Sequence, residues 1–185
     1  LRNFWIELGI TQKDISVPLA TLYAHNTKVV DDEAPRLSFV RDPVSFELIG
    51  EHPSTIDLPH HPNHPEMGVR HWNLGNSKIW LEGDDLGKMD LRLKEFADVA
   101  LHDREARMES IERSDKRPIV HWLCDNNSTD GVLVGTKDDT MFHIEGRIER
   151  HKHPTGTIVQ LERVGYARVM DNGNLMLCHE ELQDE

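Results

Sequence analysis

The stretch that decides the fold class is GTIVQLERVGYARVMDNGNLMLCHE, residues 156–180. Apolar and polar side chains alternate along both of its halves, which is typical of strands with one buried face and one exposed face. The halves meet at Asn172-Gly173, a dipeptide that favours a tight hairpin turn because both residues tolerate positive φ. The stretch therefore predicts two antiparallel strands.

The same pattern extends back along the chain to Arg36. Ten short alternating runs appear, separated by turn residues such as glycine, asparagine and aspartate. Helical segments do not alternate with these runs, as a parallel sheet would require, so we expect antiparallel pairing. Ten strands exceed one small barrel, and the sequence therefore predicts a mainly β protein with two antiparallel β-barrels.

Residues 1–33 differ from the rest, because their apolar residues follow helical spacing. We interpret them as a short helical lead-in to the barrels. The polar, charged segment 106–118 is the expected boundary between the barrels. We place a proximal barrel at 34–108 and a distal barrel at 109–173, with residues 174–185 as a C-terminal strand that could return to the proximal barrel.

The charge of the chain limits its partners. Its 185 residues include 21 lysines and arginines against 33 aspartates and glutamates, for a formal net charge of -12. This balance argues against a general nucleic-acid coat protein and against DNA as a partner, but it leaves room for selective binding by a few arginines. No apolar run is long enough to cross a membrane, so we expect no membrane partner.

The cysteines and the first residues suggest where the chain belongs. Cys124 and Cys178 are the only cysteines, and they form neither a CxxC pair nor a disulfide framework. We therefore expect a reducing, cytoplasmic setting. The opening LRNFWIELG lacks an initial methionine and resembles a helix from within a protein. We expect a fragment of a longer chain.

The sequence offers no reaction centre of its own. The motifs GxSxG, GxxxxGK[ST] and GxGxxG are absent. Carboxylates are abundant, but nothing in their spacing holds two of them at the fixed separation that acid–base catalysis requires. We therefore predict no catalytic residue.

Histidines cluster at His52, His60, His61 and His64. The prolines between them prevent the helix that would place two histidines on one face for zinc, and no cysteine lies nearby. We therefore predict no metal site here, only a loop stiffened by proline. A metal-dependent β-barrel enzyme that uses these histidines is kept as an alternative.

Arginine and glutamine side chains on the predicted strands are candidates for binding. Gln160 and Arg163 lie on opposite faces if their strand is regular, although a bulge near Gly165 would redirect them. Arg92 lies on a further predicted strand. Such residues commonly lie on a solvated face. Arginine also offers a planar fork of donors, and glutamine a donor and an acceptor, which suit the edges of unpaired RNA bases. Both interpretations stay open on spacing alone.

Several segments, taken together, resemble a known family. They are APRLSFVRDPVSFEL (34–48), LPHHPNHPEMGVRHWNL (58–74), PIVHWL (118–123) and GTIVQLERVGYARV (156–169). They resemble the C-terminal anticodon-binding part of archaeal-type glutamyl-tRNA synthetases and of the related glutaminyl enzymes. The resemblance covers nearly the whole chain in order, including the helices that lead in from the catalytic core.

The resemblance implies two successive β-barrels, of a type shared with a ribosomal protein, that bind the anticodon loop of tRNA(Glu). It implies that the parent enzyme is a class I glutamate–tRNA ligase, which activates glutamate with ATP and Mg and esterifies it to tRNA. The motifs of that catalytic domain are absent from this chain. We therefore expect no cofactor in this fragment, no catalysis by it, and a monomer.

Four residues match binding residues of the family. By resemblance, Arg36, Gln160 and Arg163 read the central anticodon uridine, and Arg92 lies near the first anticodon base. The glutaminyl enzymes carry a basic insertion before the strand of Arg92, where this chain has only GDDLGKM, residues 83–89. This departure favours the glutamyl interpretation and leaves recognition of the third base unassigned.

Four further residues are expected to be structural. Arg70, in the HPNHPEMGVR loop, could contact a phosphate or tie the loop to a carboxylate, and the structural role is favoured. Trp72, Trp80 and Trp122 lie on strand-like stretches, where stacking on a base is possible but burial in the core is commoner. Two alternatives for the function are kept. The chain could be the anticodon-binding region of a glutaminyl-tRNA synthetase, or a stand-alone RNA-binding β-barrel protein with no ligase attached.

Overall fold

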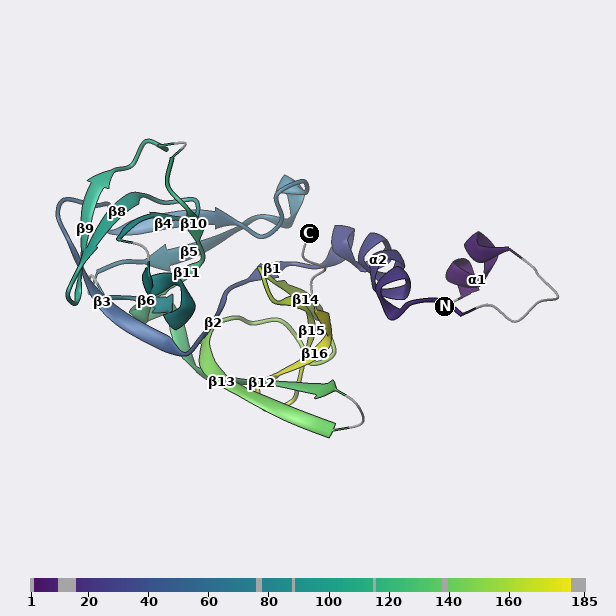
Figure 1. The fold of residues 1–185 in the computed structure, drawn as a ribbon. Coiled ribbons are helices and arrows are strands. Elements are labelled where there is room, and N and C mark those ends of the chain that lie inside the picture. The colour runs from purple at the N-terminus through teal and green to yellow at the C-terminus, as the bar shows by residue number, and fades with distance from the viewer. Residues whose placement is uncertain are drawn as a thin grey trace.

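The computed structural model describes residues 2–9, 16–75, 78–87, 89–114, 116–137 and 140–180. Two sheets that curve into nearly closed barrels form the main body of the fold, and two helices lie to one side of them (Figure 1). The predicted mainly β fold with two barrels is therefore confirmed. Residues 181–185 of the expected C-terminal strand lie outside the described residues.

The predicted helical lead-in is confirmed. It consists of α1 (Arg2–Leu8), α2 (Leu19–Val30) and the short 3-10 helix η1 (Asp31–Glu33). Pro18 stands directly before α2. Its fixed φ suits the entry to a helix, and it removes no hydrogen bond there because the first N–H groups of a helix have no partner inside it. No helix in the described part of the chain is long and apolar enough to cross a membrane.

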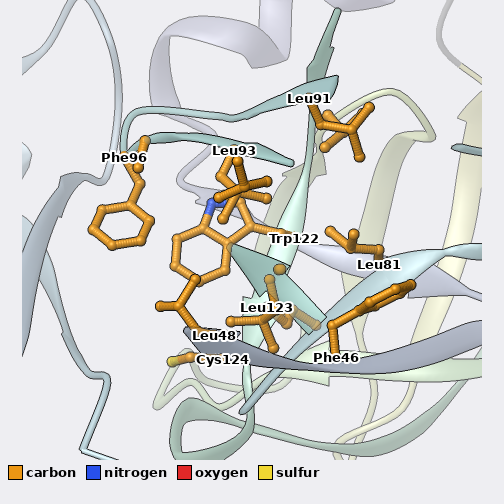
Figure 2. Close-up of a cluster of buried hydrophobic side chains, with 14 of the residues drawn as sticks. Phe46, Leu48, Leu81, Leu91, Leu93, Phe96, Trp122, Leu123 and Cys124 are labelled. Carbon is orange, nitrogen blue, oxygen red and sulfur yellow. The ribbon is translucent and has the colours of Figure 1, made fainter. Parts of the chain in front are cut away.

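The first sheet has the strand order β10-β7-β8-β9-β3-β6-β11. Its strands are β3 (Pro43–Ile49), β6 (Lys78–Glu82), β7 (Asp90–Leu93), β8 (Asp98–His102), β9 (Glu105–Ser110), β10 (Ile119–Val120) and β11 (Trp122–Cys124). In the core of this sheet, Trp122 is stacked on Phe96, with ring centroids 5.1 Å apart (Figure 2). Trp122 is also in edge contact with Trp72, with ring centroids 5.2 Å apart. Both tryptophans are 2% exposed, as predicted, whereas Trp80 on β6 is only half-buried.

The second sheet has the order β1-β14-β15-β16-β12-β13-β2. Its strands are β1 (Arg36–Leu37), β2 (Phe39–Arg41), β12 (Ser128–Lys137), β13 (Thr140–Glu149), β14 (Ile158–Leu161), β15 (Gly165–Val169) and β16 (Leu175–Glu180). A separate hairpin, β4 (Thr55–Pro59) and β5 (Val69–Asn73), reaches from the first sheet towards the second, and the Arg36 N–H donates to the carbonyl of His60 at 2.7 Å. The short 3-10 helices are η2 (Pro65–Met67), η3 (Gly83–Gly87) and η4 (Asp125–Asn127).

A single segment broken at one residue nearly closes each sheet. In the second sheet, β1 and β2 lie at opposite edges, and Ser38 is the break between them. In the first sheet, β10 and β11 lie at opposite edges, and His121 is the break. This arrangement pairs backbone groups that an open sheet edge would leave free for other chains.

Sheet membership divides the chain differently from the expected barrel limits. Strands β10 and β11 follow residue 109 yet belong to the first sheet, whereas β1 and β2 precede it and belong to the second. Strand β16 pairs with β15 and β12 in the second sheet rather than returning to the first. Four pairs (β1 with β14, β10 with β7, β3 with β9, β12 with β16) are parallel within the mostly antiparallel sheets. Alternation of apolar residues identifies strands but not their partners, which are distant in the sequence.

The predicted hairpin at Asn172-Gly173 is confirmed. Strands β15 and β16 pair antiparallel on either side of it, and Gly173 has φ +78°. The Gly173 N–H donates to the Met170 carbonyl at 3.0 Å, and the Met170 N–H donates to the Asn174 carbonyl at 2.9 Å.

The contact of β2 with β13 predicts that alanine substitutions at two glycines change the stability of the protein by different amounts. A Cβ atom at Gly146 would lie 2.5 Å from the Val40 carbonyl oxygen and 2.8 Å from the Phe39 ring, whereas nothing lies within 4 Å at Gly87. We expect Gly146→Ala to lower the free energy of unfolding by about 1–3 kcal/mol because it pushes the closing segment off the sheet. Gly87→Ala is the control and should change it by less than about 0.5 kcal/mol. Equal urea midpoints for the two variants would contradict this account of barrel closure.

Candidate nucleic-acid interface

Two of the predicted binding residues lie side by side on neighbouring strands. Arg36 on β1 pairs in parallel register with Gln160 on β14, and Leu37 pairs with Leu161. Both leucines are fully buried in the second core. Because successive side chains on a strand point to opposite faces, Arg36 and Gln160 both lie on the outer face of the second sheet.

The guanidinium group of Arg36 is already bound by protein groups. The side chain is buried, its Nη2 lies 2.9 Å from Asp31 Oδ1, and its Nη1 donates to the Ala34 carbonyl at 3.0 Å. Burial alone would raise the pKa of Asp31. The hydrogen bond from the Tyr166 hydroxyl, together with the charge and hydrogen bond of Arg36, outweighs burial and lowers the pKa of Asp31. In this structure Arg36 therefore anchors η1 to the sheet.

The row that begins with Arg36 and Gln160 continues across two more strands. Gln160 is in register with Tyr166 on β15, which is in register with His179 on β16. The ring of Tyr23 on α2 stacks on His179 at 5.0 Å. Helix α2 thus covers one end of the row. Gln160 is half-buried, and its side-chain amide makes no hydrogen bond with the described residues.

Arg163 does not follow the strand alternation that was predicted for it. It lies in the tight turn between β14 and β15 with φ +64°, and the register shift between Tyr166 and Ala167 is in the pairing of β15 with β16. The turn directs the Arg163 side chain towards the first sheet, where Nη1 donates to Asp85 Oδ2 at 2.8 Å and contacts His121 Nδ1 at 3.3 Å. About half of the side chain (49%) stays exposed, and the hydrogen bond to Asp85 raises the pKa of Arg163.

Arg163 belongs to a chain of polar contacts between the two sheets. Nε of Arg41 on β2 donates to Glu82 Oε1 on β6 at 2.7 Å. The other Glu82 oxygen lies 2.9 Å from His121 Nε2, and His121 contacts Arg163. The position of the exposed part of Arg163 therefore depends on both barrels.

Arg92 lies apart from the other three predicted residues. It is buried on β7 of the first sheet, and its Nη1 donates to Asp98 Oδ1 at 3.1 Å and to the Ile111 carbonyl at 3.0 Å. The nearest link to the second sheet is Lys94, which pairs with Glu162 beside Arg163 at 2.5 Å. The structure thus brings Arg36 and Gln160 together on the second sheet and holds Arg163 just after β14, the strand of Gln160. It places Arg92 in the first sheet.

Glu149 is a structurally important residue that the sequence analysis did not identify. This buried carboxylate accepts hydrogen bonds from Arg70 Nη1 at 2.7 Å, Trp72 Nε1 at 2.8 Å and the Ser38 N–H at 3.1 Å. The predicted tie between Arg70 and a carboxylate is therefore confirmed. Burial raises the pKa of Glu149. Nothing in the sequence distinguishes Glu149 from the many other carboxylates of the chain.

The histidine loop packs against the lead-in. His61 Nε2 contacts the Asp31 carbonyl at 2.9 Å, and His64 pairs with Glu66 at 2.7 Å. In the described ranges, no three histidine, cysteine, aspartate or glutamate side chains converge as a metal site would require. Sequence reasoning also missed the run RHKH, residues 150–153, whose basic character in an acidic chain was the available signal.

Comparisons with known proteins show what this chain is similar to. Residues 34–117 match the family model of the class I tRNA synthetase (E and Q) anticodon-binding domain. A glutamate–tRNA ligase of Methanosarcina acetivorans is 33% identical over 91% of this chain and 31% of its own length. The corresponding ligase of Methanothermobacter thermautotrophicus is 29% identical over 97% of this chain and 33% of its own length. The chain thus spans about a third of the length of these relatives.

The contacts of Glu149 predict that loss of its buried ion pair lowers the free energy of unfolding more than loss of an exposed ion pair does. Arg70→Met leaves a buried carboxylate with one charged partner fewer, and we expect the free energy of unfolding to fall by about 3–5 kcal/mol at pH 7. Arg107→Met removes the exposed pair with Glu105 and should cost less than about 1 kcal/mol.

The destabilisation in Arg70→Met should also depend on pH. Without Arg70 the pKa of Glu149 rises further, so the folded variant binds a proton that the unfolded chain releases, and its deficit shrinks as the pH falls from 7 towards 5. Urea unfolding at both pH values measures this. A deficit that stays constant with pH, or one no larger than that of Arg107→Met, would refute the role given to Glu149.

Proposed function

The chain belongs to the class I tRNA synthetase (E and Q) family through its anticodon-binding domain, and from this premise we propose that it binds the anticodon loop of tRNA(Glu). The observation that carries this proposal is the family match over residues 34–117 together with the alignment of nearly the whole chain with glutamate–tRNA ligases. We further propose that it acts as a monomer in the cytoplasm.

Gln160 and Arg163 are the groups best placed to read a base. The Gln160 amide offers a donor and an acceptor that no described residue uses, and it is carried on a paired strand that limits its movement. Arg163 keeps half of its side chain exposed while Asp85 fixes its direction. A group that is held in place before binding loses less entropy on meeting a base, which favours selective binding.

Arg36 and Arg92 are less available to a base than Gln160 and Arg163. Each is about nine-tenths buried and bound to a carboxylate, Asp31 and Asp98 respectively. For either residue to read a base directly, the base would have to use its remaining donors or replace these contacts. We propose that Arg36 holds β1 and η1 beside Gln160.

The acidic character of the chain fits selective rather than general RNA binding. A formal net charge of -12 disfavours non-specific attraction to a polyanion. Affinity must therefore come from a few placed groups, and discrimination from hydrogen bonds to base edges.

Ligation itself is proposed for the larger protein that such relatives represent. We propose that it joins glutamate to tRNA(Glu) with ATP and Mg, using parts that this chain does not contain. The residues present do not fit these cofactors. The chain has no glycine-rich phosphate-binding motif, and its described residues do not bring three metal ligands together. The role of this chain is to fix the register of the tRNA.

A binding experiment tests the proposal. The chain is titrated with a stem-loop RNA that carries the glutamate anticodon, and with the same RNA bearing cytidine in place of the central uridine. We expect Gln160→Ala to weaken binding of the first RNA by about 1–3 kcal/mol and to bring the two RNAs closer in affinity, because the amide no longer distinguishes the bases. Arg163→Ala should act in the same direction.

Arg107→Ala is the matched control for Arg163→Ala, because it also removes an exposed arginine that is bound to a carboxylate. Thermal unfolding of each variant checks that the fold is kept. Equal affinities of the unmodified chain for the two RNAs, or unchanged discrimination in Gln160→Ala and Arg163→Ala, would count against the proposed function.

A further inference from the structure

A cavity of about 510 Å³ lies where β5 meets the segment that follows β13. This volume is in the range of roughly 300–1,000 Å³ that is common for small-ligand sites. We call it the three-histidine cavity after His60, His151 and His153, which line it together with the basic residues Arg70, Arg150 and Lys152. A fourth lining histidine, His71, is paired with Asp57.

The cavity is a basic site on an acidic protein. The side chains of Arg150 and Lys152 are exposed and make no hydrogen bond or ion pair with the described residues. The carboxylate that lines the cavity, Glu149, is 2% exposed and already bound by Arg70 and Trp72. The two cations therefore have no ion-pair partner among the described residues.

Three of the four histidines that line the cavity have no carboxylate partner among the described residues. Five described histidines each lie within ion-pair distance of a carboxylate: His25, His64, His71, His102 and His121. His60, His151 and His153 have no such partner among the described residues. Their rings instead contact one another, with centroids 5.8 Å apart for His60 and His153 and 5.6 Å apart for His151 and His153.

Two of these rings have unused hydrogen-bonding capacity. His60 Nδ1 and His151 Nδ1 are buried and have no hydrogen-bond partner among the described residues. Buried polar atoms are rarely left unpaired unless a ligand or ordered water completes them. Burial lowers the pKa of His151, and burial together with the Arg70 charge lowers the pKa of His60. Burial and the charges of His151, His60 and Arg70 lower the pKa of His153.

We propose that the three-histidine cavity binds a phosphate group of the RNA backbone, with Arg150 and Lys152 as charged donors and the three imidazoles completing the site. This inference rests on the proposed function, since it concerns RNA bound by the same chain. Guanidinium and ammonium groups form charge-assisted hydrogen bonds to phosphate oxygens, and an imidazole N–H adds another donor. A backbone phosphate carries no sequence information, so this site adds affinity and register rather than base specificity.

The lining also implies a dependence on pH. The charged groups that face the imidazoles are Arg70 with its partner Glu149, the cations Arg150 and Lys152, and at the rim His71, which pairs with Asp57 at 2.6 Å. A bound phosphate favours the protonated imidazoles, whereas the empty cavity disfavours them. Binding is therefore linked to proton uptake, and affinity should rise as the pH falls from 8 to 6.

The first experiment removes the two free cations. The chain with Arg150→Ala and Lys152→Ala is titrated with the glutamate stem-loop RNA and with its central-base variant at several salt concentrations. We expect affinity to fall about ten-fold for both RNAs alike, and the salt dependence to become shallower by about one for each phosphate that is no longer bound. Arg104→Ala with Arg107→Ala, on exposed parts of the first sheet, removes the same charge and should change affinity by less than about three-fold.

The second experiment addresses the imidazoles. His151→Asn with His153→Asn keeps polar side chains of smaller size but removes two titrating groups. We expect RNA affinity at pH 8 to stay within about three-fold of the unmodified chain and the increase towards pH 6 to be flattened. An unchanged pH profile in this variant would overturn the role of the histidines.

Inorganic phosphate distinguishes an RNA site from a small-anion site. It should displace RNA only at concentrations far above that of the RNA. If inorganic phosphate binds the unmodified chain but not Arg150→Ala with Lys152→Ala, while both bind RNA equally, the RNA assignment is overturned.

The two proposals fail in different ways. If the further inference is wrong, base discrimination persists and removing Arg150 and Lys152 leaves affinity unchanged. If the proposed function is wrong, the unmodified chain shows no preference for the central uridine, although weaker RNA binding in the Arg150 and Lys152 variant would still support a phosphate site.

Discussion

The buried carboxylate of Glu149 is the contact on which the arrangement of the molecule depends. It belongs to β13 of the second sheet, and it binds the break residue of the closing segment, Ser38, together with Arg70 and Trp72 of the β4–β5 hairpin. A buried charge is tolerated only when its hydrogen bonds are made, and those bonds are directional. The two barrels are therefore held in one orientation by polar contacts, to which the chain from Arg41 to Arg163 adds a second set.

Local features of the fold could be predicted from the sequence, but long-range pairing could not. The start of α2 after Pro18 and the hairpin at Asn172-Gly173 follow from backbone preferences of a few adjacent residues. The breaks at Ser38 and His121 have no such local signature. Each depends on two sheet edges meeting one segment, and the residues of those edges are far away in the sequence.

The candidate site shows the same division. Resemblance to a family placed Arg36 and Gln160 on one surface, and the structure brings them into register. The carboxylates that bind Arg36 and Arg92 could not be inferred from spacing, because ion pairs form between residues that only the fold brings together. Arg163 was assigned to a strand face because the pattern does not show where β14 ends and its turn begins.

The central claim is that the β14 surface of a rigid pair of barrels meets the middle base of an anticodon. It is tested most directly by placing 4-thiouridine at the central position of the glutamate stem-loop RNA, irradiating its complex with this chain, and mapping the crosslinked peptide. The account predicts a crosslink within residues 156–168, which include Gln160 and Arg163. A crosslink confined to β8 and β9 of the first sheet, or an equal yield at every loop position, would contradict it.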